Sequence, residues 1–328
     1  MKRCMGTDKP LISILMAVYE PRMDWLKEQL DSLNAQTYPN LRLYIRDDCS
    51  PTVPFSDIRA LAEQCVTAFP YSILRNTENL GSNKTFERLT EEAEGEYFAY
   101  CDQDDVWLPE KLFVLQECLE REQAELVCSD MYIIDENGRQ TASSMTKARK
   151  HHIFKSGEGL APQLLISNFV TGCTMLVRAV QARAAAPFCP DMVHDHYLAL
   201  WCAAYGKIVS LPRQLIRYRI HSGNQTSMMA GVKDKESYYT VRIVSLVRRL
   251  EWLQARFQDD PELAAEIQAA LDWANARAKS FRGEAGAKKI VWAGRRFSPL
   301  TSLFEITMAG APRQLFMVFI KLKRSNIV

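Results

Sequence analysis

The sequence of 328 residues predicts an α/β fold: a mixed, mainly parallel sheet flanked by helices, followed by a helical extension at the C-terminus. Two observations lead to this prediction. Short apolar runs alternate four times with helical segments between residues 11 and 101, as in parallel sheets covered by helices on both faces. After about residue 225 the composition changes and long helical patterns replace the strands. We therefore expect two domains, residues 1–225 and 226–328.

Hydrophobic periodicity defines the elements of the first part. Continuous apolar runs predict buried strands at 11–19, 41–45, 71–74 and 97–101. Apolar residues at helical spacing predict helices between these strands, at 23–33, 58–69 and 84–92.

The pattern is less regular after residue 105. Helices are expected at 109–122, 194–206, 238–256 and 261–278. Strands are expected at 125–134, 169–178, 208–211 and 215–220. The polar, basic stretch 141–158 has no periodicity and is predicted to be a loop.

Charge and cysteine content narrow the class of protein. A net charge of +2 gives no reason to expect nucleic acid as a partner. Nine cysteines without a CxxC pair argue against a structural zinc site, and their odd number indicates reduced thiols in a cytosolic protein. The first ten residues lack the apolar segment of a signal peptide, and no apolar run is long enough to predict a membrane-spanning helix.

Three carboxylates follow directly after the predicted strand 97–101: Asp102, Asp104 and Asp105. The carboxyl ends of strands are where open α/β sheets bind ligands. Acids so close together repel each other and lose hydration there, so a compensating charge is needed. Mg²⁺ or Mn²⁺ with a phosphate ligand is the expected partner, since both ions prefer oxygen ligands. The alternative is a solvated helix cap before Pro109.

Two polar motifs follow other predicted strands. Carboxylates in RDDCSP, residues 46–51, can accept hydrogen bonds from a base or from ribose, although Asp and Ser also favour turns and helix caps. In NLGSNK, residues 79–84, Lys84 can reach a phosphate at the start of a helix. An ordinary helix N-terminus is the alternative for this motif.

Two further candidates lie downstream. In HDHYLALW, residues 194–201, Asp195 precedes an apolar helix and can act as a general base, or it can be a helix cap. The pair His194 and His196 is a weak zinc signal because no third Cys or His is near in sequence. His221, in YRIHSGNQT, is either an ordinary histidine or a metal ligand that arrives from far along the chain.

Seven segments, in their order along residues 10–225, resemble the family 2 glycosyltransferases: ISILMAVYEPR, RDDCSPT, NLGSNKTF, CDQDDVWLPEKL, TGCTMLVR, HDHYLAL and YRIHSGN. The resemblance implies an inverting, nucleotide-sugar-dependent enzyme with a Rossmann-like fold of the kind called GT-A. The motifs CDQDDVW, HDHYLAL and YRIHSGN are most similar to the rhamnosyltransferase-like branch, whose members build surface polysaccharides.

The resemblance also implies roles for individual residues. The residues expected to bind the nucleotide-sugar are Val18, Tyr19, Glu20, Asp47, Asp48, Lys84, Asp102 and Gln103. Asp104 and His221 are expected to ligate Mn²⁺ or Mg²⁺, and Asp195 is the expected catalytic base. The chain departs from the family pattern in two places, with DDCSPT in place of DDGST and HDH in place of ED.

The implied donor is dTDP-rhamnose or a UDP-sugar, and the implied acceptor is a hydroxyl of a growing surface polysaccharide or lipid-linked glycan.

The apolar, basic segment 312–324 either lies peripherally on the inner face of the cell membrane or packs as a helix or oligomer contact. Two other classes stay open. One is a nucleotidyltransferase, but such enzymes usually have a Gly-rich signature that MAVYEPR lacks. The other is a non-catalytic scaffold, but the presence of Asp104, Asp195 and His221 argues against the loss of activity.

Overall fold

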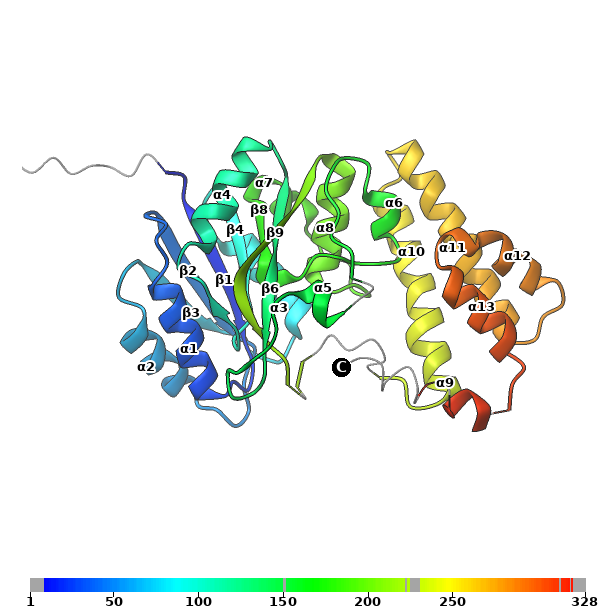
Figure 1. Cartoon of the computed structure of the whole chain (residues 1–328), viewed down its shortest axis with the longest axis horizontal. Coiled ribbons are helices and arrows are strands. Elements are labelled where there is room, and N and C mark those ends of the chain that lie inside the picture. The colour runs from blue at the N-terminus through cyan, green and yellow to red at the C-terminus, as the bar shows by residue number, and fades with distance from the viewer. Residues whose placement is uncertain are drawn as a thin grey trace, which may run out of the picture. The chain divides into compact units, whose positions relative to one another are not determined.

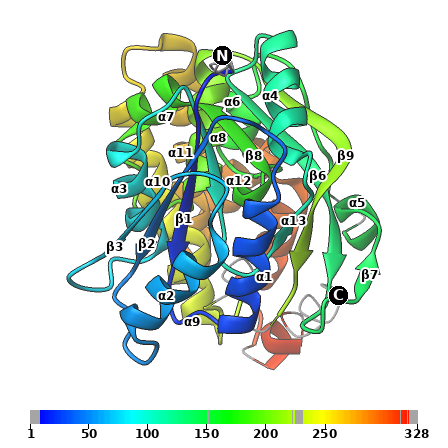
Figure 2. The ribbon, with the colours of Figure 1, turned by 90° about the vertical axis from the view of Figure 1, so that its left-hand side faces the viewer.

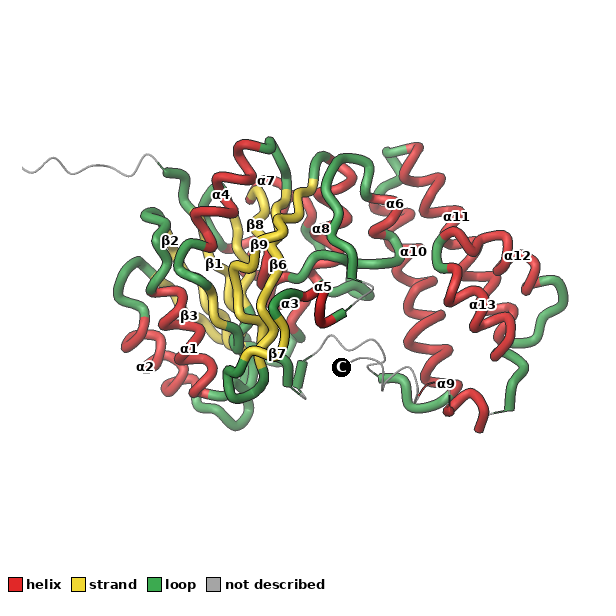
Figure 3. The backbone as a smooth tube through the Cα atoms, in the orientation of Figure 1, coloured by secondary structure: helices red, strands yellow, loops and turns green. Residues whose placement is uncertain are grey.

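The computed structural model describes residues 9–149, 152–221, 223–224, 231–312, 314–318 and 320. They form two compact units (Figure 1). The first contains residues 9–160, 168–188 and 193–221, and the second contains residues 161–167, 189–192 and the described residues from 223 onward. Among the described residues all strands lie in the first unit (Figure 3). The predicted domain boundary after residue 225 stays a prediction.

A nine-stranded mixed sheet organises the first unit. Its strand order is β3-β2-β1-β4-β8-β6-β9-β5, and β7 pairs with β6. The strands are β1 Ile12–Val18, β2 Leu41–Asp47, β3 Tyr71–Arg75, β4 Tyr97–Cys101, β5 Val106–Trp107, β6 Leu126–Ile134, β7 Gln140–Ala142, β8 Met175–Arg178 and β9 Ile208–Arg219. The first four in spatial order are parallel, whereas β8 runs antiparallel between β4 and β6. The predicted α/β fold with a mixed sheet is confirmed.

Helices cover both faces of this sheet, with α1 on one side of β1 and α3 on the other (Figure 2). The helices of the first unit are α1 Met23–Asn34, α2 Phe55–Cys65, α3 Ser82–Glu92, α4 Lys111–Arg121, α5 Met145–Ala148, α7 Ala179–Ala185 and α8 His194–Tyr205. In α1 the apolar stripe Leu26, Leu30 and Leu33 is buried, as its spacing predicts. The apolar side chains of β1 are buried against such stripes, which fixes the strand ends that carry the site.

Three local predictions were wrong. Only the second half of 169–178 is a strand, because Gly172–Thr174 forms a 3₁₀ turn. The strands predicted at 208–211 and 215–220 are one strand, β9, whose register shifts beside Pro212; a bulge accommodates a residue without an N–H donor. The predicted loop 141–158 contains the end of β7 and the helix α5, whose first turn is capped by the Ser144 hydroxyl.

The regular elements in the described part of the second unit are all helices, which confirms the helical extension. Its elements are α6 Ala161–Leu164, α9 Lys235–Tyr238, a π-helical stretch Tyr239–Val244, α10 Ser245–Arg256, α11 Pro261–Phe281, α12 Ala287–Ala293, a 3₁₀ turn Gly294–Arg296 and α13 Pro299–Met308. A buried ion pair joins α11 to α13, since Arg277 donates two hydrogen bonds of 2.7 and 2.6 Å to the Glu305 carboxylate.

The segment 312–324 is described only in part. Residues 314–318 and 320 are helical, and Phe316 and Ile320 are buried in a cluster with Val232, Tyr238 and Ile243. Leu315 and Val318 expose more than half of their surface. Residues 313, 319 and 321–324 lie outside the described residues. Among the helices that the structure describes, none combines the length and apolar character needed to cross a membrane.

Candidate active site

The predicted site residues meet because three parallel strands end at the same edge of the sheet. Val18 of β1 pairs with Asp47 of β2, and Met16 of β1 pairs with Cys101 of β4. The segments that follow these strands therefore lie side by side. The Gln103 side chain links two of them: its Oε1 accepts the Tyr19 N–H at 2.8 Å and its Nε2 donates to the Tyr19 carbonyl at 3.0 Å.

The expected base pocket begins at the end of β1. Val18 is buried, whereas the Tyr19 side chain is 42% exposed and available to a flat ligand. Glu20 adopts a left-handed backbone conformation, with φ of 45°. Its carboxylate accepts the Thr52 N–H at 2.8 Å, and hydrogen bonds from Thr52 lower the pKa of this carboxyl. Glu20 thus ties the loop after β1 to the loop after β2.

Asp47 and Asp48 are both buried and their carboxylates have protein partners. Asp47 forms an ion pair of 3.1 Å with Arg75 Nε and accepts from Ser50. Asp48 accepts the Leu80 and Gly81 N–H groups at 2.9 and 2.8 Å. These bonds are those of the turn and helix-cap alternative, and contact of either aspartate with a base stays a prediction.

Lys84 lies in the first turn of α3, directly after the loop that Asp48 holds. Its ammonium group pairs with Glu87 Oε1. Half of its side chain surface is exposed, so the group can reorient toward a phosphate at the helix start.

The acids of the DQDD segment occupy three different environments. Asp104 Oδ2 lies 2.6 Å from His221 Nε2, and both side chains are partly exposed, at 17% and 14%. Asp105 is fully buried and accepts the Arg219 N–H at 3.0 Å. Arg219 Nε also donates to the Asp104 carbonyl at 2.8 Å. Asp105 and Arg219 therefore fix the end of β9 so that His221, two residues further on, lies beside Asp104.

Asp102 is electrostatically coupled to this group. Burial first, then the charges of Asp104 and Asp195, raise the pKa of Asp102 to about 7. Asp195 lies near this group although it is more than ninety residues downstream, because the Gly172 N–H donates to it and the Sγ of the next residue, Cys173, lies within 4.8 Å of an Asp102 carboxylate oxygen. A carboxylate with so high a pKa is stabilised by any cation that binds near it.

Two donor sets can be tested for a divalent ion. Among the described residues, ligand atoms of Asp102, Asp105 and Cys173 lie within 4.8 Å of one another. Burial raises the pKa of the Cys173 thiol well above its usual range, so the protonated sulfur is a poor ligand, and the ammonium of Lys111 donates to the Cys173 carbonyl. Asp104 and His221 offer an oxygen and a nitrogen that solvent can reach. This second pair fits Mn²⁺ or Mg²⁺ better.

Asp195 lies in the first turn of α8, where two donors hold its carboxylate. The Gly172 N–H donates to Oδ2 at 3.0 Å, and Asn168 Nδ2 donates to Oδ1 at 3.1 Å. Burial nevertheless raises the pKa of Asp195 to about 6. Such a carboxylate is ionised at neutral pH and is basic enough to accept a proton from a hydroxyl.

A close contact explains why Gly172 stands beside Asp195. A Cβ atom at this position would lie 2.7 Å from His194 Nε2. The His194 ring packs 4.0 Å from the Phe86 ring, and burial lowers the pKa of His194 to about 3. His194 is therefore a neutral packing residue, which disfavours the zinc interpretation. Sequence reasoning missed Asn168 and Gly172 as partners of Asp195, although TGCTMLVR contains the glycine.

The mixed sheet with carboxylates at the ends of its parallel strands has the GT-A fold, and a family-model match shows the class: the protein is a glycosyltransferase. The model of the family described as Glycosyl transferase family 2 matches residues 13–182, more than half of the chain. The chain therefore belongs to glycosyltransferase family 2.

Curated relatives agree with this assignment. An uncharacterized glycosyltransferase of Methanocaldococcus jannaschii is 24% identical over 72% of this chain and 79% of its own length. A Bacillus subtilis protein, TuaG, whose name assigns it provisionally to teichuronic acid biosynthesis, is 33% identical over 32% of this chain and 40% of its own length.

Solved structures share the fold at low sequence identity. A TarS fragment from S. aureus in complex with UDP-GlcNAc superposes with a TM-score of 0.57 and 18% identity, over 92% of this chain and 81% of that chain. The mannosyltransferase PcManGT from Pyrobaculum calidifontis, in complex with GDP-Man and Mn²⁺, superposes with a TM-score of 0.54 and 17% identity, over 92% and 85% of the two chains.

Proposed function

We propose that this protein is an inverting glycosyltransferase that moves a sugar from dTDP-rhamnose or a UDP-sugar to a hydroxyl of a surface polysaccharide or lipid-linked glycan. The observation that carries the proposal is the Asp195 carboxylate. It is buried and held by Gly172 and Asn168, and Cys173, which follows Gly172, lies beside Asp102 of the acidic cluster. A base beside a donor-binding edge is the arrangement that direct displacement requires.

The surrounding residues support the same chemistry. Tyr19 and Gln103 would line the donor edge, the half-exposed Lys84 can turn from Glu87 toward a phosphate, and Asp104 with His221 would hold the divalent ion. When bound, that ion supplies positive charge for the diphosphate of the leaving group. Asp195 removes the proton of the acceptor hydroxyl as that oxygen attacks the anomeric carbon. Attack from the face opposite the nucleotide inverts that carbon and needs no covalent enzyme intermediate.

The test is a donor screen with stereochemical analysis. The purified full chain is incubated with dTDP-, UDP- and GDP-sugars, with and without Mn²⁺, and proton NMR follows the anomeric centre of the transferred or hydrolysed sugar. We expect metal-dependent release of one nucleotide class and a product of inverted configuration. A retained configuration would contradict the mechanism, and nucleotide binding without turnover of any donor would favour the non-catalytic scaffold.

We also propose that the segment 312–324 contacts the inner face of the cell membrane. Leu315 and Val318 support this, because they expose apolar surface while Phe316 anchors the same helix. Replacing Leu315 and Val318 by Ser is expected to reduce flotation with anionic vesicles and to leave the melting temperature nearly unchanged. The matched control carries Ser at the exposed Val180 of α7. Equal flotation of all three proteins would contradict membrane contact through this segment.

A further inference from the structure

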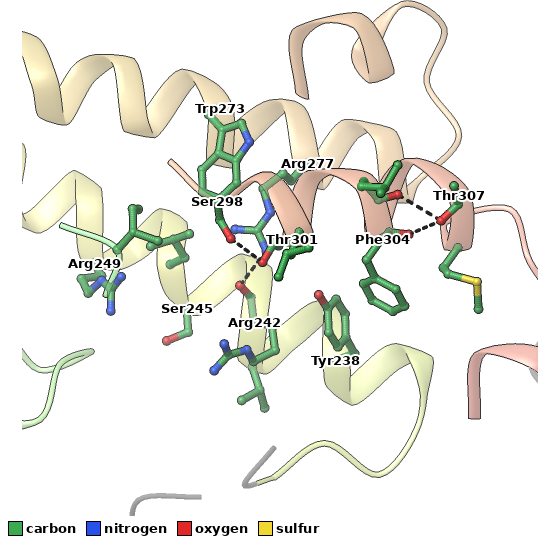
Figure 4. Close-up of a pocket in the computed structure, with 16 residues that line it drawn as sticks. Tyr238, Arg242, Ser245, Arg249, Trp273, Arg277, Ser298, Thr301, Phe304 and Thr307 are labelled. Carbon is green, nitrogen blue, oxygen red and sulfur yellow. Dashed lines mark hydrogen bonds between the residues drawn. The ribbon is translucent and has the colours of Figure 1, made fainter. Parts of the chain in front are cut away.

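The helical unit contains a pocket of about 620 Å³ that the proposed sugar transfer does not use. Its volume is in the range of small-molecule sites. All lining residues belong to this unit, and they come mainly from the continuous helical segment 235–256 and from α13, with Trp273 and Arg277 contributed by α11 (Figure 4).

One wall of the pocket is apolar and open. It is formed mainly by α13, through Leu300, Leu303, Phe304 and Met308, and Val241 of the π-helical stretch adds to it. Leu300 and Leu303 are 73% and 52% exposed, and Val241 is 39% exposed. Large apolar side chains gathered in one pocket and left in contact with water indicate a surface that binds an apolar group.

The pocket also carries positive charge that is only partly paired with carboxylates among the described residues. Three arginines line it, and only Arg277 has a carboxylate partner, Glu305. Arg249 donates to the Leu165 carbonyl at 2.8 Å, but its buried Nε has no hydrogen-bond partner among the described residues. The carboxylate of Asp191 is paired with the neighbouring Arg248 at 2.8 Å, and it also accepts a hydrogen bond of 3.1 Å from the hydroxyl of the pocket residue Ser245. Neither Arg242 nor Arg249 forms an ion pair within the described part of the chain.

The charged and apolar parts are separated along the pocket. Arg242, Ser245 and Arg249 recur at helical spacing, so they share one face of the segment 235–256. Figure 4 shows Arg249 and Ser245 on one side of the pocket, and Phe304 and Thr307 on the other. The ring of Tyr238, at the start of the same segment, lies 5.7 Å from that of Phe304. A ligand that satisfies both parts has a charged head and an apolar chain.

We propose that this pocket binds an anionic amphiphile, a phosphate or pyrophosphate group attached to an apolar chain. The head lies between Arg242 and Arg249, whose guanidinium groups donate charge-assisted hydrogen bonds to phosphate oxygens. The chain covers Leu303, Phe304 and Met308. A neutral apolar ligand leaves the Arg249 Nε unpaired, and a hydrophilic anion leaves the apolar wall in water.

Calorimetry with dodecyl phosphate below its micellar concentration tests the proposal on the full chain, without donor or metal. We expect binding to the unmodified protein and a loss of affinity of about tenfold or more in Arg249→Gln and in Arg242→Gln. Arg295→Gln is the matched control, because Arg295 is an exposed arginine of the same unit that does not line the pocket. Its affinity is expected to be unchanged. Arg242 is exposed, so its variant tests the site even if Arg249→Gln fails to fold.

Three comparisons can overturn the proposal. Inorganic phosphate that binds as tightly as dodecyl phosphate would reduce the site to an anion site. Dodecanol that binds as tightly as dodecyl phosphate would mean that the arginines do not contribute to the affinity. Leu303→Asn is expected to lower the affinity for dodecyl phosphate by about tenfold. An unchanged affinity would mean that the apolar wall does not contact the ligand. Asp195→Asn is expected to bind dodecyl phosphate normally, so this test fails or succeeds independently of the proposed sugar transfer.

Discussion

Asp195→Asn is expected to lower the rate of sugar transfer by about 10²- to 10⁴-fold, the usual contribution of a general base. The amide has nearly the same shape and its oxygen can still accept the Gly172 N–H, so the local fold is expected to remain, with the loss of the hydrogen bond from Asn168. Because the side chain lies on the acceptor side of the proposed reaction, the affinity for the donor nucleotide should change little. Initial rates and calorimetric nucleotide binding on the same preparations measure the two effects.

Asp130→Asn is the matched control for this substitution. Asp130 is also buried, but its carboxylate bonds Gln214 and the Met145 N–H of the first unit. The Asp130→Asn variant should retain the rate of sugar transfer.

In the unmodified enzyme the rate of transfer is expected to rise with pH through about 6, since burial raises the pKa of Asp195 to about 6 and only the ionised form is a base. Wild-type rates in Asp195→Asn, or the same acid limb, would remove Asp195 from the mechanism.

Asp104→Asn and His221→Gln are each expected to reduce Mn²⁺-dependent transfer by at least about 100-fold, because even the outer partners of metal ligands are worth about 10- to 100-fold. The two side chains lie 2.6 Å apart and would hold the same ion. The double variant is therefore expected to lose little more than either single variant, the non-additivity of residues that act as a unit. The measurements are transfer rates and Mn²⁺ titrations of the unmodified protein, the two single variants and the double variant, which together form a double-mutant cycle.

Controls of the same chemical kind come from outside the site. Asp57→Asn in the first turn of α2 and His152→Gln, near Phe154, should leave the Mn²⁺ dependence unchanged. Independent, additive losses for Asp104 and His221 would mean that they do not share one ion. An effect of Asp105→Asn on stability rather than on metal affinity would agree with its bond to the Arg219 N–H.

Much of this fold follows from local pattern. The apolar run 12–18 and the stripe of Leu26, Leu30 and Leu33 each predict their own element, because burial of one face repeats at the period of the backbone. The position of Asp102 and Asp104 after a buried strand also predicts a ligand-binding edge without any structure. Local pattern failed at 169–178, where the chain leaves the extended conformation so that the Gly172 N–H reaches Asp195.

The sequence by itself determined the alternation of strands and helices, the acids at the strand ends and the order of motifs that resembles family 2. Only the tertiary structure decided how the motifs meet. Asp104 and His221 are 117 positions apart, and their contact depends on Asp105 and Arg219 holding β9 against the acidic segment. No periodicity reports such a pairing, because it arises from the packing of distant segments and not from the conformation of either one. The structure also divided the three acids by environment, leaving Asp104 accessible to a metal and burying Asp105 as a support.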